Sequence, residues 1–331
     1  MKLTTALNDE CALEHPPTTA LWSENFALVF TDPRSRTAAL FSIGTWYHDT
    51  SVWRENLAVR LPDGQIVVGT NFGRNTKGAV VSASLARYEI AAPDKTVRLS
   101  YDGPVRSHSF QQLMDTGLHS GKTNRLKLDL TFEASAPMWD MHAEHRADPT
   151  GIAGSMHIEQ LGRVGGMLQL DDREIVIRDA YSCRDHSRGA RDVTNFRNHC
   201  WINGSFGNGR GFQLYFFKMH GLEGPALSLA TVVQDGEHHP ATIEQLEVVD
   251  GPADFARQHT VALRSNLGEM RISIDEVLAT LPIHMTSPFN PAFGIGQGSY
   301  GLLFDEAIRI GWNGDTGFGW CERGFARQPI R

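Results

Sequence analysis

The segment Leu126–Phe132 constrains the fold more than any other stretch of the sequence. It reads LKLDLTF, so an apolar residue alternates with a polar one throughout. Side chains of a β-strand point alternately to opposite faces of the sheet. One face of this strand is therefore expected to be buried and the other to meet water, which is typical of an antiparallel sheet.

Short strand-like segments recur along the chain with turn residues between them. The turns Pro62–Gly64 and Asn313–Asp315 contain the residues that favour tight hairpins. Only Glu276–Leu281 is expected to form a short helix. Strands at such regular spacing predict an all-β sandwich or barrel. We expect strands at residues 26–30, 38–43, 57–61, 65–68, 97–101, 126–132, 211–218, 227–233, 243–249, 260–263, 271–277, 307–312 and 318–322.

The glycine-rich segment Gly162–Gly166 separates two sets of strands of ordinary domain size. We therefore expect an N-terminal arm at residues 1–20, a first β-domain at residues 21–165 and a second β-domain at residues 166–331. The second domain would carry the charged motif described next. The sequence contains no strict internal repeat, so it does not itself show that the two domains are duplicates.

Charged residues are concentrated in the segment Arg184–Asp192, which reads RDHSRGARD. The preceding strand places apolar residues at alternate positions, namely Ile175, Ile177, Tyr181 and Cys183. If this alternation continues, Asp185 joins the apolar face and points toward the interior. Burial disfavours the charged form of a carboxyl group and raises its pKa, which suits a general acid at neutral pH. Gly189 is expected to end the strand.

Two interpretations of this motif stay open at the level of sequence. Arginines and aspartates at this density could form a fully paired network that braces a barrel rim without any chemistry. They could equally hold a catalytic or ligand-orienting group, because both arrangements perturb pKa values.

The motif resembles the RDHSWGPRD signature of a family of two-domain, lipocalin-like proteins related to carotenoid 1,2-hydratase, hydroxyneurosporene synthase and AttH. Seven of the nine positions match, while Arg188 replaces Trp and Ala190 replaces Pro. The segments Trp22–Gly44 and Trp312–Arg323 are also similar to the opening block and the closing hairpin of that family. The resemblance implies an all-β protein of two lipocalin-like antiparallel β-barrel domains packed together.

The resemblance also implies a reaction class. It predicts a cofactor-independent lyase or isomerase, of hydratase, dehydratase or cyclase type, that transfers protons on a hydrophobic small molecule such as a terpenoid, steroid-like or aromatic compound. A non-catalytic, lipocalin-like carrier of an apolar ligand is the main alternative. In a third interpretation, the shape of the pocket alone promotes a pericyclic reaction.

Under the enzymatic interpretation, Asp185 donates or accepts the proton, and His186 relays it or orients a water. Arg184 and Arg191 hold neighbouring carboxylates or a polar group of the substrate. Glu322 in the closing hairpin is a second proton donor, since tryptophans precede it and an indole face can stabilise a carbocation. The pocket wall is expected to contain the aromatic side chains of Trp46, Tyr47, Tyr181, Trp312 and Trp320.

Structural alternatives apply to these residues as well. Glu322 could instead form a rim ion pair with Arg323, and Trp46 could simply fill the core, since large aromatics with polar tips suit both places.

Other motifs do not support a metal or a cofactor. His142 and His145 are close in sequence but lack the His-Glu-x-x-His spacing of a zinc site. The glycines of Gly294–Gly298 do not open a helix after a strand, as a dinucleotide-binding loop would. We therefore expect no metal ligands and no cofactor.

Composition limits the partners. The chain carries 31 basic and 38 acidic residues without a dense basic run, so nucleic acid and anionic membrane surfaces are not expected partners. It has neither the apolar core of a signal peptide near residue 1 nor an apolar run of membrane-spanning length. The four cysteines form no CxxC pair. These features predict a cytoplasmic protein with a hydrophobic small-molecule ligand and no membrane span, and they allow a homodimer.

Overall fold

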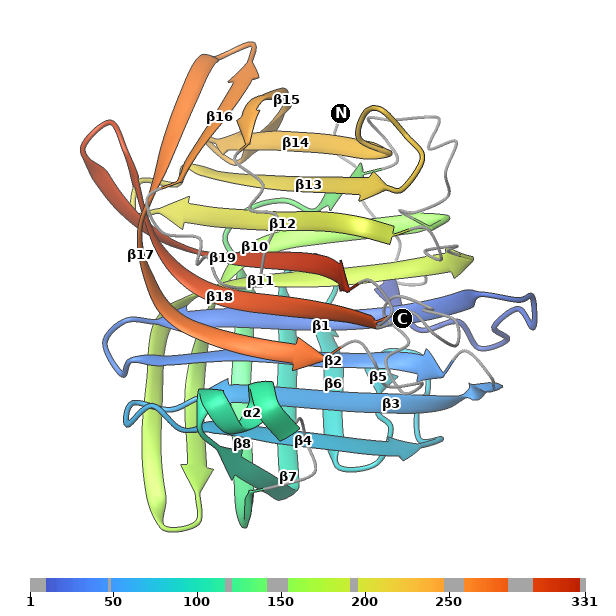
Figure 1. The fold of residues 1–331 in the computed structure, drawn as a ribbon. Coiled ribbons are helices and arrows are strands. Elements are labelled where there is room, and N and C mark those ends of the chain that lie inside the picture. Colours follow the sequence, from blue (N-terminus) through green and yellow to red (C-terminus); the bar gives the residue numbers. More distant parts are fainter. Residues whose placement is uncertain are drawn as a thin grey trace.

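The computed structural model describes residues 10–46, 49–116, 121–141, 154–190, 196–246, 259–284 and 300–327. Two antiparallel β-barrels lie one on the other, with the second barrel above the first in Figure 1. The prediction of an all-β protein built from two packed barrels is therefore confirmed.

Eight strands close the first barrel in the order β4-β3-β2-β1-β11-β10-β8-β7, with β4 also paired to β7. Strand β7 is long enough to serve two neighbours, since its first half pairs with β6 and its last residues pair with β4. The strands of this sheet are β1 (Trp22–Asp32), β2 (Thr37–Trp46), β3 (Asp49–Arg60), β4 (Ile66–Gly73), β5 (Val80–Val81), β6 (Ala86–Ala92), β7 (Thr96–His108), β8 (Lys122–Ala134), β9 (Trp139–Asp140), β10 (Met156–Leu170) and β11 (Arg173–Ala190).

The second barrel is closed by eight consecutive strands, each paired with the next and β19 paired with β12. Neighbours in this order also follow one another in the chain, and the tight turn expected at Asn313–Asp315 joins β18 to β19. The strands are β12 (Phe196–Phe206), β13 (Gly211–Met219), β14 (Leu227–Gln234), β15 (Glu237–Leu246), β16 (Thr260–Ser265), β17 (Gly268–His284), β18 (Tyr300–Trp312) and β19 (Asp315–Arg327).

The short helix is not where the sequence predicted it. Residues 276–281 lie inside β17 and pair with β18, so the helix expected there is wrong. A short helix, α2 (Phe110–Thr116), lies beside the first barrel instead. Ser109 and Gln112 form a capping box at its start, with each side chain bonded to the other residue's backbone N–H. No helix in the described part of the chain is long and apolar enough to cross a bilayer.

The boundary between the barrels also differs from the prediction. Gly162–Gly166 lies within β10, and both β10 and β11 belong to the first barrel. The charged motif is thus part of the first barrel, which ends at Ala190, and the second barrel begins at Phe196. Gly166 marks a bulge rather than a crossing, because its φ is +145° and a Cβ would lie 2.1 Å from the carbonyl oxygen of Asp129. The strand β11 also continues through Gly189.

A bulge reverses the side-chain alternation expected along β11. Asp179 has a φ of +50°, and the pairing with β10 shifts by one residue between Ile177 and Ala180. Ile177 and Ala180 both contribute to the interior of the first barrel. Tyr181, Cys183 and Asp185 therefore point out of that barrel, toward the second barrel, and the prediction that Asp185 shares a face with Ile177 is wrong.

Arg184 and His186 of the motif occupy the interior of the first barrel. The Nε of Arg184 donates to Gln160 at 2.7 Å, and its Nη2 donates to Glu10 at 3.1 Å. His186 stacks on Phe26, with ring centroids 3.8 Å apart. These contacts tie the segment around Glu10 to the barrel core.

Removing the Arg184 guanidinium tests its structural importance. Arg184→Ala would leave Glu10 buried without its cation, and loss of one partner of a buried ion pair costs about 3–5 kcal/mol. Arg87→Ala, which breaks the more exposed pair of Arg87 with Glu89, is the control and should change stability by less than about 1 kcal/mol. Urea denaturation of both variants provides the comparison. Equal stability losses would contradict a structural role for Arg184.

Candidate active site

An apolar layer joins the two barrels, and a group of buried polar side chains interrupts it. Strands β1, β10 and β11 contact β12, β18 and β19 across this boundary. The layer is formed by outward-facing residues of both barrels, including Val29, Leu161, Tyr181, Cys183, Trp201, Tyr215, Leu303, Ala307 and Trp320. Polar groups placed here are removed from water, so each needs a partner or a function.

On the second barrel, an acid pair lies between a histidine and a tryptophan. Asp305 and Glu322 are directly paired across β18 and β19. The Nε2 of His199 lies 2.6 Å from the Oε1 of Glu322, and the indole Nε1 of Trp320 donates to Asp305 at 2.8 Å. The four side chains form a continuous polar chain within the interface.

Burial shifts the pKa values of the two acids and the histidine in this group toward their neutral forms. The pKa of Glu322 is raised to about 7, chiefly by burial. Contact with Asp305 lowers this pKa, and the charge of Asp185 contributes to raising it. The pKa of Asp305 lies well above its usual range, first because of burial and then because of the Glu322 charge. Burial lowers the pKa of His199 to about 4, so its ring is neutral at pH 7. Glu322 is thus the group that can gain or lose a proton under physiological conditions.

On the first barrel, two acids and a histidine face the same boundary. Glu159 and Asp185 are directly paired across β10 and β11, and His157 is two residues before Glu159 on the same face. The Nε2 of His157 lies 2.5 Å from the Oδ2 of Asp185 and 3.7 Å from the Oε1 of Glu159. All three residues are buried.

The second barrel completes the surroundings of Glu159. Gln213 donates to its Oε2 at 3.0 Å, and both Gln213 and the Trp201 indole favour its ionised form. Burial nevertheless raises the pKa of Glu159 well above its usual range, followed by the charges of Asp185 and Glu322. The acids of the two barrels are therefore close enough to influence one another.

Aromatic rings lie between the two polar groups. The Tyr215 ring contacts both His157 and His199, with centroid distances of 5.5 and 6.1 Å. Trp201 is paired with Glu322 across β12 and β19. The arrangement combines exchangeable protons with flat apolar surfaces in one enclosed region.

The structure places the predicted wall residues in different regions. Tyr181 lies at the interface, where its hydroxyl donates to the Oδ1 of Asn203, and Trp320 is held by Asp305. Trp312 stacks under Arg210 at the far end of β18, seven residues or about 23 Å from Asp305 along the strand. Trp312 is thus not part of this site.

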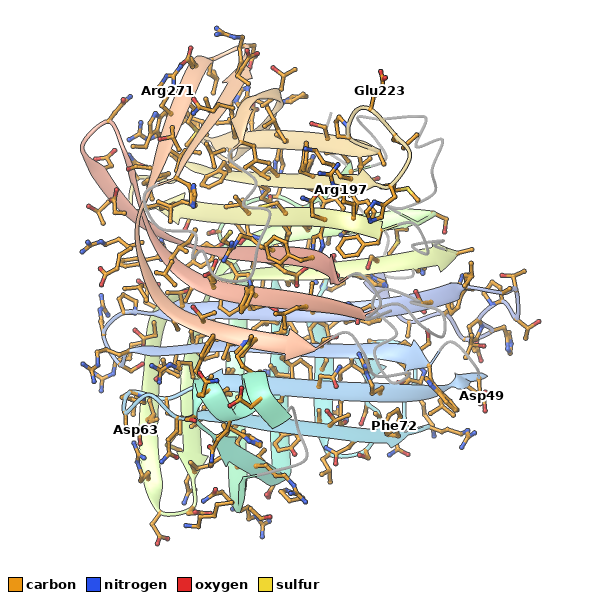
Figure 2. The ribbon with its side chains drawn as sticks, in the orientation of Figure 1. Asp49, Asp63, Phe72, Arg197, Glu223 and Arg271 are labelled. Carbon is orange, nitrogen blue, oxygen red and sulfur yellow. The ribbon has the colours of Figure 1, made fainter. Side chains whose placement is uncertain are left out.

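Trp46 also lies away from the polar groups. It is four residues beyond Ser42, which shares the cross-strand row of Asp185, and four residues of strand span about 13 Å. Its ring packs against Phe72, which Figure 2 shows at the edge of the first barrel, and Phe72 is 40% exposed. The expected pocket of Trp46, Trp312 and Trp320 together is therefore wrong. Tyr47, Arg191, His142 and His145 lie outside the described residues.

Two predicted catalytic residues, Arg184 and His186, point into the first barrel and away from the interface. The Nε2 of His186 lies 2.9 Å from Glu24 inside the first barrel, so His186 is not placed to relay a proton from Asp185. Arg184 is held inside the same barrel by Glu10 and Gln160, as described above. His157 is the histidine that contacts Asp185.

The sequence analysis missed most of the residues that surround Asp185 and Glu322. Their signal is a polar residue at every second position of a strand, as in His157-x-Glu159 and His199-x-Trp201. Such a pattern resembles an ordinary water-facing side of a sheet. Only the packing of a second barrel on that face buries it.

Comparison with known proteins identifies a family without an assigned activity. A domain of unknown function, DUF7064, matches residues 8–325. The chain belongs to the DUF7064 family. No curated protein matches it.

Solved structures share the fold of this DUF7064 protein. A crystal structure from Nitrosomonas europaea, provisionally described as AttH, aligns with a TM-score of 0.58 at 12% identity and covers 92% of each chain. CghA in complex with Sch210972 aligns with a TM-score of 0.56 at 10% identity, covering 93% of this chain and 89% of CghA. The lipocalin-like, two-barrel resemblance expected from the sequence is thus confirmed at the level of the fold.

The raised pKa of Glu322 predicts a pH-dependent difference in stability. The folded value near 7 exceeds the ordinary 4.5, so the bound proton stabilises the fold fully below pH 4.5, and this contribution is lost as pH rises through 7. Glu322→Gln cannot ionise. The free energy of unfolding of the variant minus that of the wild type, measured by urea denaturation, should rise by up to about 3 kcal/mol between pH 5 and pH 8.5.

Other groups at the interface titrate in both proteins, so the difference between them isolates Glu322. Asp305 and Glu159 act in the same direction as Glu322, whereas the lowered pKa of His199 acts in the opposite direction below pH 6.5. A stability difference that does not change with pH would contradict the assigned protonation.

Proposed function

We propose that this protein is a proton-transferring lyase or isomerase that acts on a hydrophobic small molecule bound between the two barrels. The observation that carries the proposal is Glu322, a partly buried carboxyl group whose pKa of about 7 lets it hold a proton at neutral pH and release it to a substrate. Its position beside Trp201 and Trp320 supports an apolar, unsaturated substrate.

A hydration illustrates the chemistry. Glu322 gives its proton to one carbon of a carbon–carbon double bond, and the positive charge left on the other carbon is stabilised by the indole faces of Trp201 and Trp320. A water adds to that carbon, and the Glu322 carboxylate takes up the proton that the water loses. The alkene and water become an alcohol, the acid is restored, and the reverse sequence is a dehydration.

The remaining polar groups have supporting roles in this proposal. Asp305 lies next to Glu322, and its own pKa is raised well above the usual range, first by burial and then by the charge of Glu322. In this proposal Glu322, with a pKa of about 7, is the exchangeable acid. His199 is neutral and fixes the orientation of the Glu322 carboxyl through its 2.6 Å contact. Asp185 and His157, on the opposite wall, position a water or a polar group of the substrate, so the proton donor expected at Asp185 is assigned here to Glu322.

Two further observations support a small-molecule function. CghA, a protein of the same fold, was crystallised with the compound Sch210972. The four cysteines of the present chain are free, which suits a reducing compartment such as the cytoplasm.

The proposal predicts loss of proton transfer when Glu322 is changed. Wild-type protein incubated in D2O with a panel of terpenoid and aromatic alkenes should incorporate deuterium into the accepted alkene, as detected by mass spectrometry. Glu322→Gln should lower the rate by about 100-fold or more, because general acids contribute 10²–10⁴-fold. Binding, followed by tryptophan fluorescence, should be retained. The wild-type kcat/KM should fall above pH 7, where the donor loses its proton.

Glu276→Gln is the matched control, because Glu276 is half exposed and pairs with Arg309 on the surface. It should leave the rate within about twofold. Binding without either product formation or deuterium incorporation in the wild type would support the carrier alternative. Product formed by the wild type without deuterium incorporation would support catalysis by shape alone. A Glu322→Gln rate of deuterium incorporation within tenfold of the wild type would contradict the role of Glu322 as the proton donor.

A further inference from the structure

The first-barrel side of the interface contains three side chains of the kind that bind metals. Glu159 and Asp185 are cross-strand partners on β10 and β11, and His157 lies on the same face of β10. One ligand atom from each residue lies within 4.8 Å of the others. Because β-sheet pairing fixes their backbones, the three side chains are preorganised toward a common point.

The hydrogen bonding of these groups is incomplete. Within the described residues, the Oε1 of Glu159 and the Nε2 of His157 have no hydrogen-bond partner, although both are buried. Asp185 Oδ2 lies 2.5 Å from that Nε2, but outside hydrogen-bond geometry. The Glu159 side chain is fully buried, and its Oε1 faces His157. Buried atoms of this kind cost about 1–3 kcal/mol each when left unsatisfied, and a bound cation would satisfy both.

We propose that His157, Glu159 and Asp185 form a binding site for a divalent metal ion of the zinc type. One imidazole and two carboxylates match the nitrogen and oxygen ligands of Zn²⁺, and two carboxylate charges balance a dication. Three protein ligands leave a fourth position open, which is the arrangement of sites that bind a water or a substrate atom.

The geometry requires only a small adjustment. Ligand atoms about 2.0–2.2 Å from a tetrahedral ion are about 3.3–3.6 Å apart. The Nε2 to Oε1 separation of 3.7 Å is already close to this value, and the Nε2 to Oδ2 separation of 2.5 Å would widen by about 1 Å. Gln213 from the second barrel holds the other oxygen of Glu159, as an outer-shell partner of a metal ligand does.

This site goes beyond the acid chemistry proposed above and does not depend on the catalytic role of Glu322. Glu322 belongs to the second barrel and is paired with His199 and Asp305, neither of which is a ligand in this proposal. A bound ion would lie on the first-barrel wall of the same interface, where it could hold a polar group of a ligand. The expectation from sequence of a protein without a metal would then be wrong.

Metal titration of the full-length protein tests the site directly. Protein stripped with EDTA is titrated with Zn²⁺ by calorimetry and with Co²⁺ by visible absorption. We expect one ion per chain and a Co²⁺ spectrum of low coordination number. Glu159→Gln keeps the side-chain shape and removes only the charge, and it should weaken binding by at least about 10-fold, as should His157→Gln.

Two control variants make the outcome decisive. Glu322→Gln should bind the metal as the wild type does, even where it has lost deuterium transfer, so failure of either proposal can be distinguished from failure of the other. His239→Gln changes a histidine in the second barrel that contacts Asn266, and it should also bind normally. Absence of saturable binding, or binding that survives both Glu159→Gln and His157→Gln, would overturn the proposed site.

Discussion

Asp305 and Glu322 face each other across adjacent strands of the second barrel; Asp305 is fully buried and Glu322 is partly buried. Two ionised carboxylates this close together would repel strongly, and burial removes the water that would screen them. Keeping a proton on the pair is the lower-energy solution. Burial raises the pKa of both acids, and the charge of Glu322 raises that of Asp305 further. Burial also lowers the pKa of His199 beside them, so that its ring is neutral.

The buried ion pairs inside the two barrels differ from the acids at the interface. Each stabilises its own interior with a buried ion pair, Arg184 with Glu10 in the first barrel and Arg323 with Glu306 in the second. Both pairs join residues that lie on the same side of the boundary between the barrels. The acids at the interface differ, because donors such as Gln213 reach them only when the barrels are packed together. Docking of the barrels therefore creates the unusual protonation, and neither barrel alone contains all of its parts.

In the central motif, one strand carries both residues that stabilise the interior of the first barrel and a residue that faces the interface. Arg184 and His186 point inward and fix the segment to Glu10 and Glu24, while Asp185 between them points at the second barrel. The structural and the chemical interpretations of the motif thus apply to alternate residues of the same strand. Alternation with a period of two makes this division possible.

Strand alternation and turn residues are local signals, so they were sufficient to predict the all-β class and the hairpin turns. The two barrels were expected from the resemblance to the lipocalin-like family. It was not sufficient to place the face of Asp185, since the bulge at Asp179 reverses the alternation and a bulge of this kind leaves no clear mark in the sequence. The boundary near residue 165 was wrong for a similar reason, because the glycines there serve a bulge within β10.

The candidate site was even less accessible to prediction. His157, Glu159 and Asp305 resemble ordinary polar positions on the wet face of a strand, and only the arrangement of the second barrel shows that they are buried. Trp312 was expected in the pocket wall as an aromatic side chain of the closing hairpin, but each residue of a strand adds about 3.3 Å to its length. A hairpin that is compact in sequence therefore spans the length of the barrel.

Carbon NMR of the glutamate side-chain carboxyls, recorded as a function of pH and assigned to Glu322 by comparison with Glu322→Gln, measures the protonation of that group directly. We predict a titration midpoint near pH 7 in the folded wild-type protein. A midpoint near the ordinary value of about 4.3–4.5 would mean that Glu322 is ionised at neutral pH, which would contradict its assignment as the proton donor.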